Sequence, residues 1–211
     1  MNKSFLTACL LMISAVSQAQ TLKDFFANES APSTYLGLDF SLARVINDPK
    51  ASPENMVDKI FPGINDLTIK EYEKRYNVGD AFRHKSMDHD LTGVTARNAK
   101  ISKDAVLSTN TADATRLKEA DIKALVSHLD MGGKKGIGVV FIVEAMDKSD
   151  KKFVVWPAIV NMDTHTVLLT ERIAGKTGSG FSERNFWASG FRDALDEIDG
   201  HKYKEWKKAH S

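Results

Sequence analysis

The chain has 211 residues, of which 42% are hydrophobic and 27% charged, proportions typical of one water-soluble globular domain. Its 29 lysines and arginines nearly balance its 28 aspartates and glutamates, which excludes a general electrostatic attraction to nucleic acid or to an anionic membrane. With a single cysteine, the chain can form neither an internal disulfide bond nor a cysteine-rich zinc site.

The first nineteen residues have the pattern of an export signal. Lys3 supplies a positive start, and Phe5 to Val16 is an almost unbroken apolar run. Ser17 and Ala19 are the small residues expected just before a cleavage site, and the run is too short to span a bilayer. We therefore expect cleavage after Ala19 and a mature protein that is periplasmic or secreted and has no transmembrane segment.

The segment Leu6-Thr7-Ala8-Cys9 is similar to the box that directs lipid attachment in bacterial lipoproteins. However, only residues 5–8 would precede Cys9 as an apolar stretch, whereas a signal needs about seven such residues. Lipidation at Cys9 is therefore disfavoured, and the mature chain should contain no thiol.

The first half of the mature chain gives one strand and one helix. Residues 20–33 are polar and mixed in character, so we expect a leader segment before the domain. Alternation of apolar and polar residues predicts a strand over residues 35–46. Ser52 as a capping residue and Pro53 in the first helical position predict a helix over residues 53–75, with a kink at its internal Pro-Gly pair.

Residues 77–112 give the weakest pattern. The apolar pieces at 91–94 and 105–107 predict short strands separated by polar loops. Apolar positions three and four apart predict an amphipathic helix over residues 113–130, which Gly132 and its neighbour should end.

The strongest pattern is a series of three strands, at residues 136–146, 152–162 and 166–174. Their links are short and polar, which predicts antiparallel hairpins. The first two strands are apolar on both faces, so they should lie inside a sheet that is covered on both sides. Pro157 has no N–H group to donate, so a bulge or a locally unpaired edge is expected there.

A glycine-rich loop at residues 175–180 leads to a last amphipathic helix at 182–199, followed by a basic tail at 201–211 that we expect to be solvated. These elements predict a single α+β domain over residues 34–200. Its central sheet would be mostly antiparallel, with about five strands and three main helices, and would end in a hairpin meander followed by a helix.

The runs GIGVVFIVEAMDK and VLLTERIAGKTGSGFSERNFWASG resemble a family of uncharacterised exported proteins from Bacteroidetes. The earlier runs YLGLDFSLARVI and INDLTIKEYEKRYNVGDAF are similar to the same family's first strand and helix. The resemblance covers most of the mature chain and implies a single exported domain, but the family has no assigned activity.

The glycine-rich loop is the first candidate site. It is not a nucleotide-binding phosphate loop, because Thr170 stands where the first glycine of that motif is required. Its glycines could instead let backbone amides converge on an anion at the start of the following helix, where the helix dipole favours negative charge. A plain linker is the alternative. The ligand-binding residues that we expect are Lys176, Gly178, Gly180, Arg184 and Asn185.

His84, Asp88, His89 and Asp90 form a compact group of side chains that can bind metal. Two histidines and one carboxylate could hold zinc and leave a position open for water, although the spacing matches no known motif. A solvated loop is the alternative.

Glu144 interrupts an otherwise apolar strand. It is either ion-paired, with Lys148 or Arg172, or has a raised pKa, and we favour a structural ion pair.

These observations predict an exported envelope protein that acts as a non-enzymatic binding or interaction module. Its partner would be an envelope protein or a small anionic ligand, with no cofactor and no nucleic acid. The alternative is a metal-dependent periplasmic hydrolase that uses His84, His89 and a neighbouring aspartate, and a purely structural role in an assembly is a third possibility.

Overall fold

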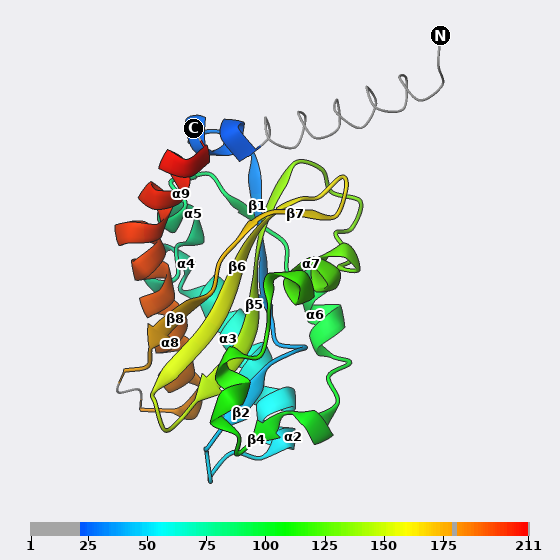
Figure 1. The fold of residues 1–211 in the computed structure, drawn as a ribbon, viewed down its shortest axis with the longest axis vertical. Helices are drawn as coiled ribbons and strands as arrows, with labels where there is room; N and C mark the ends of the chain where they lie inside the picture. Colours follow the sequence, from blue (N-terminus) through cyan, green and yellow to red (C-terminus); the bar gives the residue numbers. More distant parts are fainter. Residues whose placement is uncertain (1–21, 179–180, 211) are drawn as a thin grey trace.

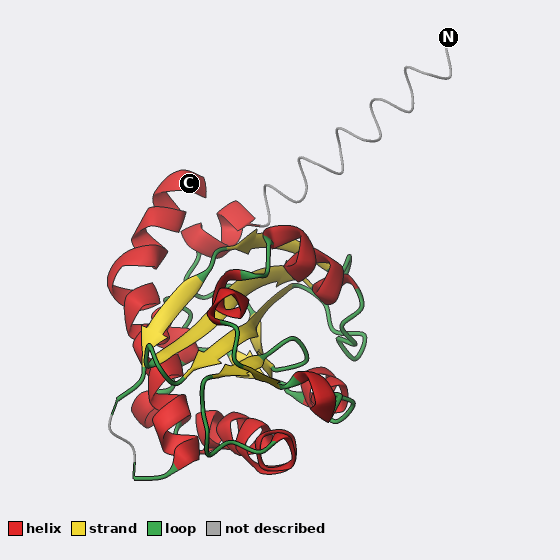
Figure 2. Ribbon diagram, turned by 60° about the horizontal axis from the view of Figure 1, so that its bottom comes forward, coloured by secondary structure: helices red, strands yellow, loops and turns green. Residues whose placement is uncertain are grey.

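The centre of the protein is an eight-stranded sheet that curls into a half-barrel (Figures 1 and 2). The computed structural model describes residues 22–178 and 181–210. The predictions about the export signal, Cys9 and Gly180 therefore lie outside the described residues.

The predicted hairpins are confirmed. β5 (Ile137–Asp147) pairs with β6 (Lys152–Asn161) in antiparallel fashion along almost its full length. On the other side of β6, the expected third strand is divided into β7 (Thr166–Thr170) and β8 (Ile173–Lys176), both antiparallel to β6. β7 pairs from Ala158 onward and β8 pairs up to Val155, so Pro157 falls in the gap between them, and the locally unpaired edge expected there is found on this side of β6.

The other half of the sheet is parallel. The expected strand at 35–46 is divided into β1 (Ser33–Asp39) and β2 (Arg44–Ile46), which follow one another along the free edge of β5 and run parallel to it. β3 (Asp88–His89) pairs with β1 and β4 (Leu107–Ser108) pairs with β2, again in parallel.

The prediction of a mostly antiparallel sheet of about five strands is therefore wrong. Four of the seven strand pairings among the described residues are parallel. Two of the three antiparallel pairs, β5–β6 and β6–β7, are joined by short polar turns that can be recognised in the sequence. The parallel pairs join segments far apart in the chain, and no local pattern reveals that pairing.

The helical elements are mostly short, and several run directly into one another. In chain order they are α2 (Pro53–Asn55), the π-helical turn η1 (Met56–Ile60), α3 (Phe61–Lys70), α4 (Tyr72–Arg75), α5 (Val78–Ala81), α6 (Thr92–Asn98), the 3-10 turns η2 (Lys103–Ala105) and η3 (Thr111–Thr115), α7 (Glu119–Ser127), α8 (Glu183–Glu197), the π-helical turn η4 (Ile198–Lys202) and α9 (Tyr203–His210).

Two of the three predicted helices are confirmed in position, and the middle one is shorter than expected. The predicted helix at 113–130 exists only as η3 and α7, with an extended capping residue, Lys118, before α7. The strand predicted at 91–94 is wrong, because these residues enter helix α6. The piece at 105–107 contributes only its last residue to β4.

Helices cover both faces of the sheet: α8 and α9 on one side, and α6 and α7 on the other (Figure 1). The α8 side holds the larger core, in which Phe141 packs edge-on against Phe191 with ring centroids 4.9 Å apart. On the α7 side, Ile122 and Val126 pack with Val140 of β5 in a second cluster. None of the helices within the described residues is long and apolar enough to cross a bilayer.

Both ends of the described chain belong to the core. Residues 22–27 form a helical turn that buries Leu22, Phe25 and Phe26, so the described part of the expected leader segment is part of the domain. The tail expected to be solvated is helix α9, which buries Tyr203 and contacts Phe26 with ring centroids 5.6 Å apart (Figure 1). The expectations of a leader segment and of a solvated tail were wrong. In each segment the few apolar residues that become buried are outnumbered by polar residues, so the composition is that of an exposed segment.

Candidate functional site

A pocket of about 650 Å³ lies at the β1 edge of the sheet, between α3 and α6. We call it the α3–α6 pocket. Its volume is in the range of about 300–1,000 Å³ that is typical of sites for small molecules. Its apolar walls are formed by Val57, Pro62, Ile69, Leu91 and Ala99.

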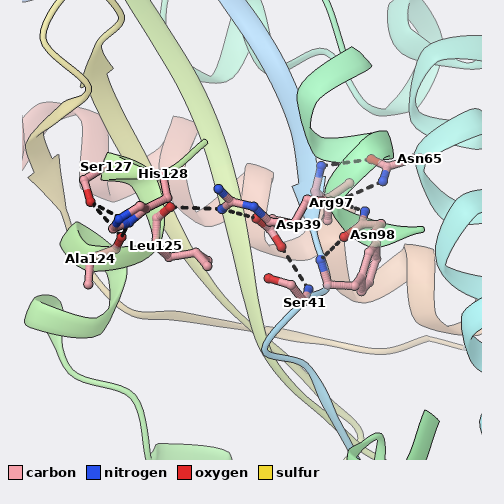
Figure 3. A network of polar contacts seen from close by, with 11 residues as sticks. Asp39, Ser41, Asn65, Arg97, Asn98, Ala124, Leu125, Ser127 and His128 are labelled. Carbon is pink, nitrogen blue, oxygen red and sulfur yellow. Dashed lines mark hydrogen bonds and ion pairs between the residues drawn. The ribbon is translucent and has the colours of Figure 1, made fainter. Parts of the chain in front are cut away.

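The floor of the pocket is polar and buried. β3 pairs with β1 only at Thr34 and Tyr35, so no strand lies beside Leu38. There the Asn65 side chain replaces the missing strand, because its amide accepts from the Leu38 N–H and donates to the Leu38 carbonyl, both at 2.9 Å. Asn98 donates to the same carbonyl at 2.9 Å and accepts from the backbone N–H of Phe40 at 2.8 Å (Figure 3).

These two amides keep some hydrogen-bonding capacity. A side-chain amide has two N–H groups and two acceptor lone pairs, and each asparagine uses one of each on β1. The pocket therefore combines apolar walls with fixed polar groups at its base, as small-molecule sites do.

Gly37 is required where β1 approaches this floor. Its φ of +99° falls in the region that favours glycine, at a bulge in the pairing of β1 with β5. A Cβ atom there would lie 2.8 Å from Cγ of Leu91 and 3.3 Å from Oδ1 of Asn65. A larger residue at this position would disturb both the wall and the floor of the pocket.

An ion pair behind the pocket fixes α6. The Asp39 carboxylate is fully buried, lies 3.0 Å from Arg97 Nη1 and accepts the Ser41 N–H at 2.9 Å. Arg97 also donates to the carbonyl of Leu125 at 3.0 Å, which joins α6 to α7 (Figure 3). The helix that carries Asn98 is thereby joined to both β1 and α7.

The rim of the pocket carries charged and titratable groups. Asp58 is 2.6 Å from Lys103 and is therefore already paired. Asp66 and Lys70 are exposed and one helical turn apart on α3, yet no ion pair of either residue is found within the described residues. The His89 ring lies 6.1 Å from that of Tyr72 and also lines the pocket.

The glycine-rich loop is organised differently from the predicted anion site. The N–H of Lys176 donates to Asp193 at 2.7 Å, and the N–H of Gly178 donates to Ser189 at 2.7 Å. Both acceptors belong to α8, so two of the amides expected to converge on an anion are already occupied. Gly180 lies outside the described residues.

The other residues of that prediction also make local contacts. The Arg184 guanidinium donates to the Asn185 side chain at 3.1 and 3.0 Å. Gly175 allows β8 to approach α8, because a Cβ atom there would lie 2.0 Å from the carbonyl oxygen of Gly190. Gly175 therefore serves the packing of β8 against α8.

The predicted metal group is divided between the core and the surface. His84 is only 1% exposed and stacks on Phe25 with ring centroids 4.0 Å apart. Its Nδ1 lies 3.1 Å from the Ala31 carbonyl and its Nε2 lies 2.9 Å from the Phe25 carbonyl, so neither nitrogen faces a metal position. His84 anchors the N-terminal segment to the domain.

The remaining members of the group lie on the surface. Asp88 accepts the backbone N–H of His89 at 2.8 Å, and Asp90 lies 3.3 Å from Lys134. In the part of the chain that the structure describes, no three His, Cys, Asp or Glu side chains come together in a group that could hold a metal ion.

The burial of His84 predicts a pH-dependent stability. Burial lowers the pKa of His84 below its ordinary 6.5, against the opposing effect of the two carbonyls. The unfolded chain then binds a proton more readily than the folded chain, so stability should fall as the pH drops below about 6.5. Urea unfolding at pH 8 and pH 5.5 should show a larger loss for the wild type than for His84→Phe, which keeps a ring against Phe25 but does not titrate. Equal losses would contradict this role.

Glu144 is a structural residue, and the predicted ion pair with Arg172 is confirmed. The buried carboxylate accepts from Arg172 Nε at 2.9 Å, from Trp156 Nε1 at 2.9 Å and from the N–H of Leu117 at 2.7 Å. These contacts attach the segment before α7 to the sheet.

Comparison of the chain with protein-family models, with curated proteins and with solved structures finds no match. The resemblance to exported proteins of Bacteroidetes therefore stays a prediction.

Proposed function

We propose that this protein is an exported, non-enzymatic binding module that holds a small amphipathic molecule in the α3–α6 pocket. One observation carries the proposal: apolar walls surround a floor of two buried asparagine amides that have hydrogen-bonding capacity left. The pattern of the first nineteen residues supports export.

The walls and the rim favour different parts of such a ligand. Val57, Ile69 and Leu91 would contact an apolar body, and each Å² of apolar surface removed from water contributes roughly 25 cal/mol. Asp66 and Lys70 would contact polar or charged substituents at the entrance. An amphipathic molecule uses both kinds of surface, whereas a small inorganic anion would use only the rim.

The chemistry of the pocket suits binding more than turnover. His89 is the histidine that lines the pocket, and among the described residues its ring makes no hydrogen bond to a hydroxyl or carboxylate. The metal-dependent hydrolase gains no support from the geometry, since His84 is enclosed by carbonyl groups of the N-terminal segment.

Filling the pocket tests the proposal. Thr95 is exposed on α6 and lines the pocket, so the indole ring of Thr95→Trp should occupy it. With 1-anilinonaphthalene-8-sulfonate as the probe, followed by its fluorescence, we expect Thr95→Trp to weaken binding about tenfold or more relative to the wild type. Ala96→Trp is the matched control, because Ala96 is also exposed on α6 but does not line the pocket. Unchanged binding in a folded Thr95→Trp protein would overturn the assignment.

A further inference from the structure

A second, smaller pocket of about 240 Å³ lies where the β5–β6 hairpin, the loop after β2 and the first turn of α8 meet, at the lower end of the molecule in Figure 1. It is separate from the α3–α6 pocket, with which it shares no lining residue. Its lining residues are Asp48, Lys50, Lys148, Phe181, Ser182, Glu183 and Phe186.

An ammonium group already lies inside this site. Lys148 Nζ is 3.8 Å from the ring centroid of Phe186, 5.4 Å from that of Trp187 and 3.8 Å from Asp48 Oδ2. Aromatic faces together with a carboxylate are the surroundings that stabilise organic cations. The Asp48 side chain is only 3% exposed, so its charge is poorly screened by water.

The second carboxylate of the site, Glu183, forms no ion pair within the described residues. Glu183 Oε2 accepts from Asn55 at 2.9 Å, but Oε1 is buried and has no hydrogen-bond partner in the described structure. Burial, and after it the charge of Asp48, raises the pKa of Glu183, against the opposing effects of Lys148 and Asn55. The backbone N–H of Lys50 donates to Asp48 Oδ1 at 3.1 Å, but within the described residues its ammonium group forms no ion pair with either carboxylate.

We propose that this pocket recognises an alkylammonium group, and that Lys148 is a built-in occupant which such a ligand displaces. Glu183 Oε1 supplies the unused acceptor, Asp48 supplies the second negative charge, and Phe186 with Trp187 supplies the aromatic faces. The volume accommodates a short aliphatic amine or the side chain of a partner's lysine. A metal ion fits less well, because the residues described around the pocket offer two carboxylates and aromatic faces.

Chemical rescue of a vacated site tests this proposal. Lys148→Ala removes the built-in ammonium and leaves Asp48 without its ion-pair partner. Isothermal titration with n-butylammonium chloride should then show binding about tenfold tighter to Lys148→Ala than to the wild type. The same salt should raise the thermal midpoint of the variant, and an equal concentration of sodium chloride should not.

Two comparisons separate charge recognition from the filling of an apolar hole. 1-Butanol has a similar shape without the charge, and we expect no comparable binding of it to Lys148→Ala. In Lys148→Ala, the additional substitution Glu183→Gln should abolish the gain in amine affinity. The additional substitution Glu54→Gln, at an exposed carboxylate outside the pocket, should preserve that gain. Butanol binding as tight as that of the amine would overturn the proposal, as would equal amine affinity in Lys148→Ala and the wild type.

The wild-type protein provides a test that does not depend on the folding of the variants. Putrescine, as a free amine, and Nα-acetyl-lysine amide, as a lysine side chain, should each shift the NMR signals of Trp187 and Phe186. Shifts caused by putrescine alone indicate that the ligand is a free amine. Shifts caused by Nα-acetyl-lysine amide indicate that the lysine side chain of a protein also fits the pocket. Absence of both shifts would overturn recognition in the native protein.

Discussion

Replacing Arg97 by methionine should lower the free energy of unfolding by about 3–5 kcal/mol, the range found when one partner of a buried ion pair is removed. The Asp39 carboxylate, which is fully buried and 3.0 Å from the guanidinium, would be left in the interior without a counter-ion. The bond from Arg97 to the Leu125 carbonyl would also be lost. Urea denaturation at pH 7 measures the change.

Arg75→Met is the matched control for this effect. Arg75 lies 3.4 Å from Glu71 one turn away on an exposed helical surface, where such pairs contribute about 0.3–0.5 kcal/mol. The double variant Asp39→Asn with Arg97→Met should recover part of the loss, because asparagine is neutral and can still accept the Ser41 N–H. If Arg97→Met is no more costly than Arg75→Met, the buried pair does not stabilise the fold.

The same substitution connects stability with the proposed site. Arg97 precedes Asn98, whose amide forms part of the pocket floor, and both belong to the short helix α6. Loosening α6 would therefore let the pocket change shape before the domain unfolds. We expect the probe affinity of Arg97→Met to fall under conditions in which the variant is still folded.

What the sequence predicted well depends on local patterns. Residues 137–161 combine two apolar runs with a short polar turn, and this is sufficient to identify the β5–β6 hairpin. Glu144 could be identified as paired because a carboxylate in an apolar strand requires donors. In both cases the information lies within one segment and its nearest neighbours in the sheet.

The rest depends on contacts between distant segments. Nothing near residue 38 indicates that β1 runs parallel to β5, or that its outer edge lacks a strand. Asn65 did carry a signal, since it lies on the apolar stripe of α3 between Ile64 and Leu67, where an unpaired amide would be destabilising. That position predicts a buried polar partner, but only the fold identifies the partner as Leu38.

Replacing Glu144 by glutamine should destabilise the protein by about 2–4 kcal/mol, although the two side chains have nearly the same shape. The carboxylate accepts from three donors, and both of its oxygens are used. A glutamine amide must point its NH₂ group either at the Leu117 N–H or at the side chains of Trp156 and Arg172, so at least one donor loses its acceptor. Thermal and urea unfolding measure the loss.

Glu171→Gln is the control for the Glu144 prediction, because Glu171 also accepts from a tryptophan, Trp206, at 2.7 Å and pairs with Lys202 at 2.7 Å. Its side chain is 41% exposed, so water can replace the lost contacts and the expected cost is about 1 kcal/mol or less. The difference between the two substitutions isolates burial, since donor type and ion pairing are similar at both positions. Similar costs would mean that the Glu144 contacts contribute no more than surface interactions do. The attachment of the segment before α7 to the sheet would then have to come from its apolar contacts alone.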